Sequence, residues 1–206
     1  MIELFLSAFV TLFVVIDPPG CAPIYAGLTT NAAPAARRSM ALRACLIAGV
    51  ILIGFALFGE DLLGAMHIDL ESFQIAGGIM LFLIALDMVF EKRTQRREDR
   101  ADKVRDDPAH EDVSVFPMAM PMLAGPGAIA SVMLLTGTAR GVEQTLVVLA
   151  ALLAVMALTL LALIAASPLM RLFGAKVEAV ITRLLGVLLA ALAAQYVIDG
   201  LRGSFG

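Results

Sequence analysis

The sequence predicts an all-α membrane protein with six transmembrane helices. Of the 206 residues, 60% are apolar and 16% are charged, whereas soluble domains carry about 25% charged residues. The mean hydropathy is +0.92. The apolar residues gather in six segments of about the length that crosses a bilayer. These features argue against a soluble or disordered chain, and a formal charge of −3 provides no basic surface for nucleic acid.

The six predicted spans are separated by polar or helix-breaking residues. They cover residues 2–29, 42–59, 72–90, 115–138, 144–166 and 184–201. The first span has no basic segment before it and no small-residue cleavage site, so we expect a membrane span rather than a signal peptide. The charged segment 91–114 is expected to be a solvated linker between a first half, 1–90, and a second half, 115–206.

The positions of Lys and Arg predict the orientation of the chain. All 15 of them except Arg140 and Arg202 lie in or beside the first, third and fifth loops. Membrane proteins retain Lys and Arg on the cytoplasmic side. We therefore expect the linker 91–114 in the cytoplasm and both termini outside.

A short internal repeat relates the two halves. At an offset of 107 residues, Pro19-Gly20 aligns with Pro126-Gly127, and at an offset of 108 residues Gly78 aligns with Gly186. Since each half has three spans, the two copies would cross the membrane in opposite directions. The sequence thus predicts two inverted three-helix repeats, which is the plan of many secondary transporters.

Spans one and four are interrupted by Pro and Gly, which break or weaken helices. As one helix, residues 2–29 would extend about 42 Å, longer than a bilayer core of about 30 Å. We therefore expect two half-helices in each of these spans, with second halves beginning near Cys21 and Ala128. Their N–H groups would suit a carboxylate at the centre of the bundle, and the carbonyls that end the first halves would suit a cation.

The candidate substrate-binding residues lie at these two interruptions. They are Asp17, Pro18, Pro19, Gly20, Cys21, Gly125, Pro126, Gly127 and Ala128. Asp17 is the only carboxylate deep in span one, and it either caps the second half-helix alone or also contacts the substrate or a coupling ion. Asp87 and Gln195, which the repeat aligns, are candidates for a gate or a polar seam.

The sequence gives no reason to expect a metal, a cofactor or an enzyme. Cys21 and Cys45 lack the spacing of a metal or redox site, and no catalytic motif is present. Small residues recur every four positions in span six, at Gly186, Ala190 and Ala194. Such stripes indicate close helix packing, either within the chain or in a homo-oligomer.

The sequence resembles the MarC family of six-span inner-membrane proteins, also classed as a neutral amino acid transporter family related to the LysE-type exporters. The resemblance covers nearly the whole chain. It is sharpest in three stretches: Val-Ile-Asp-Pro-Pro-Gly at 15–20, Pro-Ile at 23–24, and Pro-Met-Ala-Met-Pro-Met-Leu-Ala-Gly-Pro-Gly-Ala-Ile at 117–129. Cys21 stands where such proteins often have Asn, which implies a different selectivity if that amide reads the substrate.

The resemblance implies transport of small neutral amino acids, such as alanine or glycine, across the bacterial inner membrane, with coupling to H⁺ or Na⁺. It places the site at the same two interruptions. Two alternatives stay open: a passive channel for a small solute, and a membrane protein of this family without transport activity. Exchange stimulated by substrate on the far side would separate a transporter from a channel.

Overall fold

The computed structural model describes residues 1–92, 95–96, 99 and 112–205, and within them it is helical without strands. By length and composition, five of its helices can cross a membrane, or six if one bent pair forms a single span. The prediction of an all-helical membrane protein is therefore confirmed. In chain order the elements are α1 (Ile2–Ile16), α2 (Pro18–Leu28), α3 (Pro34–Ala65), α4 (Leu70–Val89), η1 (Ser114–Leu123), α6 (Pro126–Gly137), α7 (Val142–Ile164) and α8 (Ala166–Phe205).

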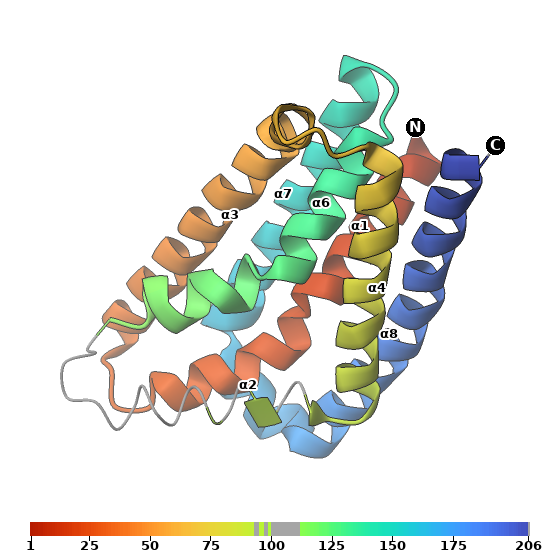
Figure 1. Ribbon diagram of the computed structural model, residues 1–206. Helices are drawn as coiled ribbons and strands as arrows, with labels where there is room; N and C mark the ends of the chain where they lie inside the picture. Colours follow the sequence, from red (N-terminus) through yellow and green to blue (C-terminus); the bar gives the residue numbers. More distant parts are fainter. Residues whose placement is uncertain (93–94, 97–98, 100–111, 206) are drawn as a thin grey trace.

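The helices form one bundle in which the chain passes repeatedly from end to end (Figure 1). Both termini lie at one end, together with the α3–α4 and α6–α7 connections. The α2–α3 turn and the α7–α8 corner lie at the opposite end. This arrangement agrees with alternating membrane crossings, while the side that faces the cytoplasm stays a prediction.

Helices α3 and α8 extend well beyond the spans that hydropathy predicts for them, 42–59 and 184–201. Pro34 occupies the first turn of α3, where a missing N–H costs nothing. The Ala, Arg and Met residues that follow are strong helix formers although some are charged. Hydropathy therefore finds the apolar part of each helix and misses its polar ends.

The first interrupted span lies at the centre of the bundle. In its most apolar window 56% of the residues are buried inside the protein, against 22–39% in the other four long helices. Those outer helices expose large apolar side chains, such as Val50, Phe58 and Leu161. A surface of this kind fits surrounding lipid rather than water. The interrupted backbone of span one is thus shielded by protein.

Helices α4 and α8 pack closely through glycines. A Cβ atom at Gly78 would lie 2.8 Å from the carbonyl oxygen of Ala193 and from Cγ2 of Val197. A Cβ atom at Gly186 would lie 2.9 Å from Cβ of Met88. Neither position has room for a side chain, so in this structure Gly186 serves packing within the chain.

A hydrogen-bond network ties the end of α2 to α3 and to the start of α8. The Tyr25 hydroxyl donates to the carbonyl of Arg37. The Arg37 guanidinium donates to the carbonyls of Thr30 and Ala32, at 2.6 and 3.0 Å, and to Oγ of Ser167 at 3.2 Å. Helix α2 is therefore anchored at its C-terminal end as well as at the interruption where it begins.

Candidate functional site

The first interruption consists of one residue, Asp17, between α1 and α2. Its backbone is left-handed, with φ 59° and ψ 64°, and its N–H donates to the carbonyl of Phe13 at 2.9 Å. Its Oδ1 accepts the N–H of Gly20 at 3.1 Å. Asp17 thus ends α1 and caps α2, as the sequence predicts. Helix α2 begins at Pro18 rather than near Cys21, because proline is pre-organised for the first helical turn.

The carboxylate of Asp17 is buried in the protein, with 1% of the residue exposed. The last carbonyl of α1 belongs to Ile16 and accepts a hydrogen bond from the thiol of Cys21 at 3.5 Å. Asp17, Pro18, Gly20 and Cys21 are buried. This interruption therefore forms a compact turn, and none of residues 17–21 lines the cavity at the second interruption.

The second interruption separates η1 from α6 and bends the chain by 53°. Segment η1 is irregular, since Phe116, Met120 and Pro121 have non-helical backbone angles. Helix α6 begins at Pro126, and its N-cap residue is Gly125, which has no side chain to cap it. A Cβ atom at Gly125 would lie 2.5 Å from the carbonyl oxygen of Pro121. The first N–H groups of α6 therefore lack the side-chain cap that Asp17 gives to α2.

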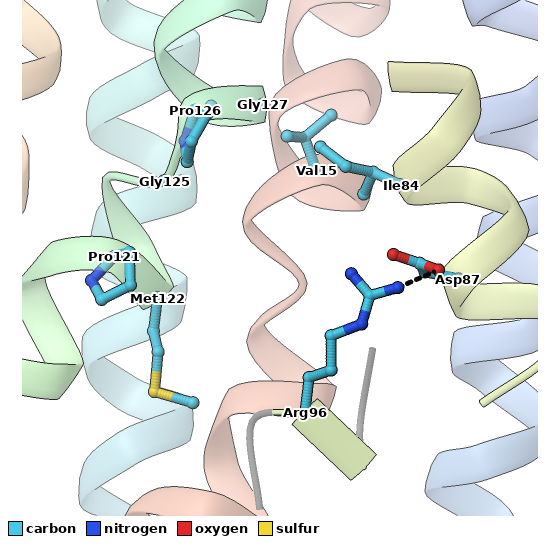
Figure 2. A pocket seen from close by; sticks show the side chains of 10 residues that line it. Val15, Ile84, Asp87, Arg96, Pro121, Met122, Gly125, Pro126 and Gly127 are labelled. Atoms are coloured by element: carbon cyan, nitrogen blue, oxygen red, sulfur yellow. Dashed lines mark hydrogen bonds and ion pairs between the residues drawn. The ribbon is translucent and has the colours of Figure 1, made fainter. Parts of the chain in front are cut away.

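A cavity of about 280 Å³ lies at the second interruption. Figure 2 shows Pro126 and Gly127 on one side of it and Val15 and Ile84 on the other. The lining comes from α1, α4, the joint between η1 and α6, and one residue after α4. The lining residues are Val15, Ile84, Asp87, Arg96, Pro121, Met122, Gly125, Pro126, Gly127 and Ala128.

The start of α6 approaches α1 and α4 closely. A Cβ atom at Gly127 would lie 2.6 Å from Cδ1 of Ile84 and 3.3 Å from Cγ1 of Val15. Val15 is two residues from Asp17, so the end of α1 meets the beginning of α6. Glycine at position 127 keeps open the space between these helices.

The two charged groups of the cavity form an ion pair. The guanidinium of Arg96 lies 2.7 Å from Oδ1 of Asp87, as the dashed line in Figure 2 marks. The Asp87 side chain is 21% exposed and the Arg96 side chain is 66% exposed. Around this pair the walls are apolar or formed by Gly and Pro.

Asp87 and Gln195, which the repeat aligns, lie apart. Asp87 is near the level of Gly186, which contacts Ala85 and Met88 on α4. Gln195 lies nine residues farther along α8, about 13 Å at 1.5 Å per residue. Its side chain is exposed and donates to Asp199 at 2.8 Å. The structure thus places Asp87 in the cavity with residues 125–128 and leaves Gln195 outside it.

Sequence reasoning missed Arg96 as a cavity residue. It lies within 91–114, whose mixed charges predict a solvated connector, and no local pattern distinguishes it from the other basic residues there. Val15, Pro121 and Met122 lie within the motifs at 15–20 and 117–129, and nothing else in the sequence marks them as cavity residues. Among the described residues no group of three or more His, Cys, Asp or Glu gathers as a metal site.

Comparison with known proteins gives a full-length match. A family model described as MarC family integral membrane protein matches residues 2–205. A UPF0056 membrane protein of Methanocaldococcus jannaschii is 34% identical over 98% of each chain. The UPF0056 membrane protein YvbG of Bacillus subtilis is 32% identical over all of this chain and 97% of its own. The UPF0056 inner membrane protein YhgN of Escherichia coli is 34% identical over 96% and 95%. No solved structure matches.

Proposed function

The chain belongs to the MarC family of integral membrane proteins, and from that premise we propose that it is a secondary transporter of small neutral amino acids, such as alanine and glycine, in the bacterial inner membrane. The observation that carries this proposal is the cavity at the second interruption. There an uncapped helix N-terminus and the carboxylate of Asp87 line the same space.

The chemistry of the cavity suits a zwitterion. The N–H groups that begin α6 carry a partial positive charge, which favours the carboxylate of an amino acid. Asp87 offers a negative partner for the ammonium group. We place this role on Asp87 rather than on Asp17, because the carboxylate of Asp17 holds the N–H of Gly20 and lies outside the cavity lining. A volume of about 280 Å³ is at the lower end for ligand pockets and suits a substrate of few atoms.

We further propose that the two halves are inverted repeats, and that spans one and four are the broken helices of these repeats. The packing of the helices supports this. Helix α1 packs on α7 while η1 packs on α3, and α2 packs on α8 while α6 packs on α4. When every helix is replaced by its counterpart in the other half, the contact of α1 with α7 becomes that of η1 with α3. The contact of α2 with α8 likewise becomes that of α6 with α4. A two-fold axis produces such an exchange of partners.

The contacts of two glycines support the repeat at the level of residues. Gly78 meets Ala193 and Val197, whereas Gly186 meets Ala85 and Val89. Gly78 corresponds to Gly186, Ala193 to Ala85 and Val197 to Val89, in each case at a distance of 108 residues along the sequence. This offset is the one at which the sequence aligns Gly78 with Gly186.

The two second half-helices extend in opposite directions from the interior, α2 towards the end that holds the α2–α3 turn and α6 towards the end that holds the termini (Figure 1). Because the helices of the two halves are interleaved, we place the transport movement at the interruptions. Opening beside α2 and opening beside α6 would expose the centre to opposite sides of the membrane.

Uptake by reconstituted protein tests this function. Purified protein in liposomes is expected to take up labelled alanine or glycine saturably, in response to a pH or Na⁺ gradient, with faster exchange when substrate is present on the far side. Uptake without saturation or exchange would favour the passive channel. Folded protein that takes up neither amino acid under any gradient would contradict the proposal.

A cavity-filling variant makes the test specific to this site. Gly127→Val would place a side chain against Ile84 and Val15 and is expected to abolish uptake. Gly54→Val is the matched control, since a Cβ atom at Gly54 meets no atom within 4 Å, and it is expected to retain uptake. Equal uptake by the two variants would place the substrate elsewhere.

A further inference from the structure

We propose that Arg96 is a built-in occupant of a cation-binding subsite formed by Asp87, and that a substrate must present an ammonium group to replace it. This inference rests on the proposed function and narrows its substrate class. It concerns Arg96 and Asp87 alone, both of which the structure places in the cavity.

Asp87 is the one carboxylate among the described residues that line the cavity. Of the ten lining residues, Asp87 and Arg96 are the two that carry charge. The guanidinium of Arg96 donates to Oδ1 of Asp87 at 2.7 Å. Any cation that enters the cavity and binds Asp87 must therefore compete with this guanidinium.

The position of Arg96 allows such a replacement. Its side chain reaches from beyond the end of α4 towards Asp87, on the side of the cavity away from Gly127 (Figure 2). Because 66% of it is exposed, it remains in contact with solvent. The guanidinium can therefore return to water when another cation takes its place beside Asp87, whose side chain is 21% exposed.

The apolar walls determine which ligands can take the place of Arg96. A carboxylate among apolar groups is unfavourable unless a cation or hydrogen bonds compensate it. Arg96 compensates Asp87 in the empty cavity, and the ammonium group of an amino acid would do so in the loaded one. An anion such as acetate offers no cation to Asp87 and therefore cannot take the place of Arg96. Zwitterions and amines should therefore bind, and simple carboxylates should not.

Two other ion pairs provide matched controls. Arg183 pairs with Glu91 at 2.5 Å and Arg43 pairs with Asp112 at 2.8 Å. Both join the ends of the linker region to the bundle, and neither contributes to the cavity lining. A general loosening of the linker region would follow from breaking any of the three pairs, whereas release of the subsite follows only from removing Arg96.

Access to the cavity can be measured without a substrate. In a background with Cys21 and Cys45 replaced by alanine, Met122→Cys places a thiol in the cavity lining, and a water-soluble maleimide reports its exposure. Arg96→Ala is expected to label several-fold faster than the background, whereas Arg183→Ala labels at the background rate. The exchanged pair Asp87→Arg with Arg96→Asp should restore slow labelling. Equal rates in Arg96→Ala and Arg183→Ala would overturn the inference.

Uptake then tests the subsite itself. Arg96→Ala is expected to lower the KM for alanine several-fold, because removing a tethered competitor raises the fraction of protein ready to bind. Asp87→Asn is expected to lose uptake. Alanine and methylamine should compete with labelled glycine, and acetate should not. Competition by acetate as strong as that by alanine would overturn the inference.

The two experiments fail separately. Uptake of alanine that is the same in Arg96→Ala and in the unmodified protein would overturn the subsite and leave transport standing. Faster labelling in Arg96→Ala together with no uptake of either amino acid would overturn the transport proposal and leave Arg96 as the group that occupies the cavity.

Discussion

The carboxylate of Asp17 occupies the space beside Gly20 that a side chain at position 20 would need. Its Oδ1 accepts the N–H of Gly20 at 3.1 Å, and a Cβ atom at Gly20 would lie 2.3 Å from its Oδ2. Because Asp17 has a left-handed backbone, one residue both ends α1 and starts α2. The first interruption therefore depends on the side chain of Asp17 and on the absence of one at Gly20.

Substitutions of Asp17 should rank by how well they keep this turn. Asn caps helices and tolerates the left-handed region, so Asp17→Asn should unfold at a temperature close to that of the unmodified protein. Asp17→Gly loses the cap but keeps the backbone. Asp17→Ala loses a cap worth about 1 kcal/mol and adds about 1–2 kcal/mol of backbone strain. Thermal unfolding in detergent, followed by circular dichroism, measures the order. A loss in Asp17→Asn equal to that in Asp17→Ala would show that the charge itself is essential.

The glycines between α4 and α8 should resist enlargement. Gly78→Ala and Gly186→Ala force a Cβ atom to within 3 Å of the opposite helix, and overpacking of this kind costs about 1–3 kcal/mol. Gly49→Ala and Gly54→Ala on α3 are the controls, because a Cβ atom there meets nothing within 4 Å. They should raise stability slightly, since alanine favours a helix over glycine. The same unfolding measurement applies, and equal effects at all four sites would contradict the close packing.

Asp112 should make stability depend on acidic pH. Burial raises the pKa of Asp112, but the hydrogen bond from the N–H of Ser114 and the guanidinium of Arg43 outweigh it, so that its pKa lies below the ordinary value. A lowered folded-state pKa stabilises the protein above the unfolded pKa of about 3.9, and this stabilisation is lost as the pH falls through the folded value. Asp112→Asn should lose stability near neutral pH and show a flatter decline below about pH 4. Unfolding curves of the two proteins, measured from neutral pH to below about pH 4, compare how their stability changes with pH.

The orientation of the chain is testable with fused reporters. Lys and Arg predict a cytoplasmic linker and external termini. Alkaline phosphatase fused after Phe205 should therefore be active, since it matures only outside the cytoplasm, and green fluorescent protein inserted within 91–114 should be fluorescent. The opposite pair of results would reverse the predicted orientation without altering the fold.

The candidate site was predictable in part. Pro and Gly mark both interruptions because their effect on a helix is local, and residues 125–128 do line the cavity. Asp87 was a candidate for a gate or a polar seam, and it lies in the same cavity. Residues 17–21 were also predicted to bind substrate; the polar groups of Asp17 and Cys21 bond within the turn between α1 and α2, and these residues lie outside the cavity lining. Arg96 carried no local signal, because its contact with Asp87 crosses nine residues of chain.

The sequence by itself determined that this is a helical membrane protein, where its apolar segments lie and where Pro and Gly interrupt two of them. These properties follow from the cost of exposing peptide groups to lipid and from the backbone limits of Pro and Gly, which act within a few residues. Only the tertiary structure decided which carboxylate faces the cavity and which cation meets it. The rotation of each helix depends on packing between distant residues, such as Gly127 against Ile84 and Val15.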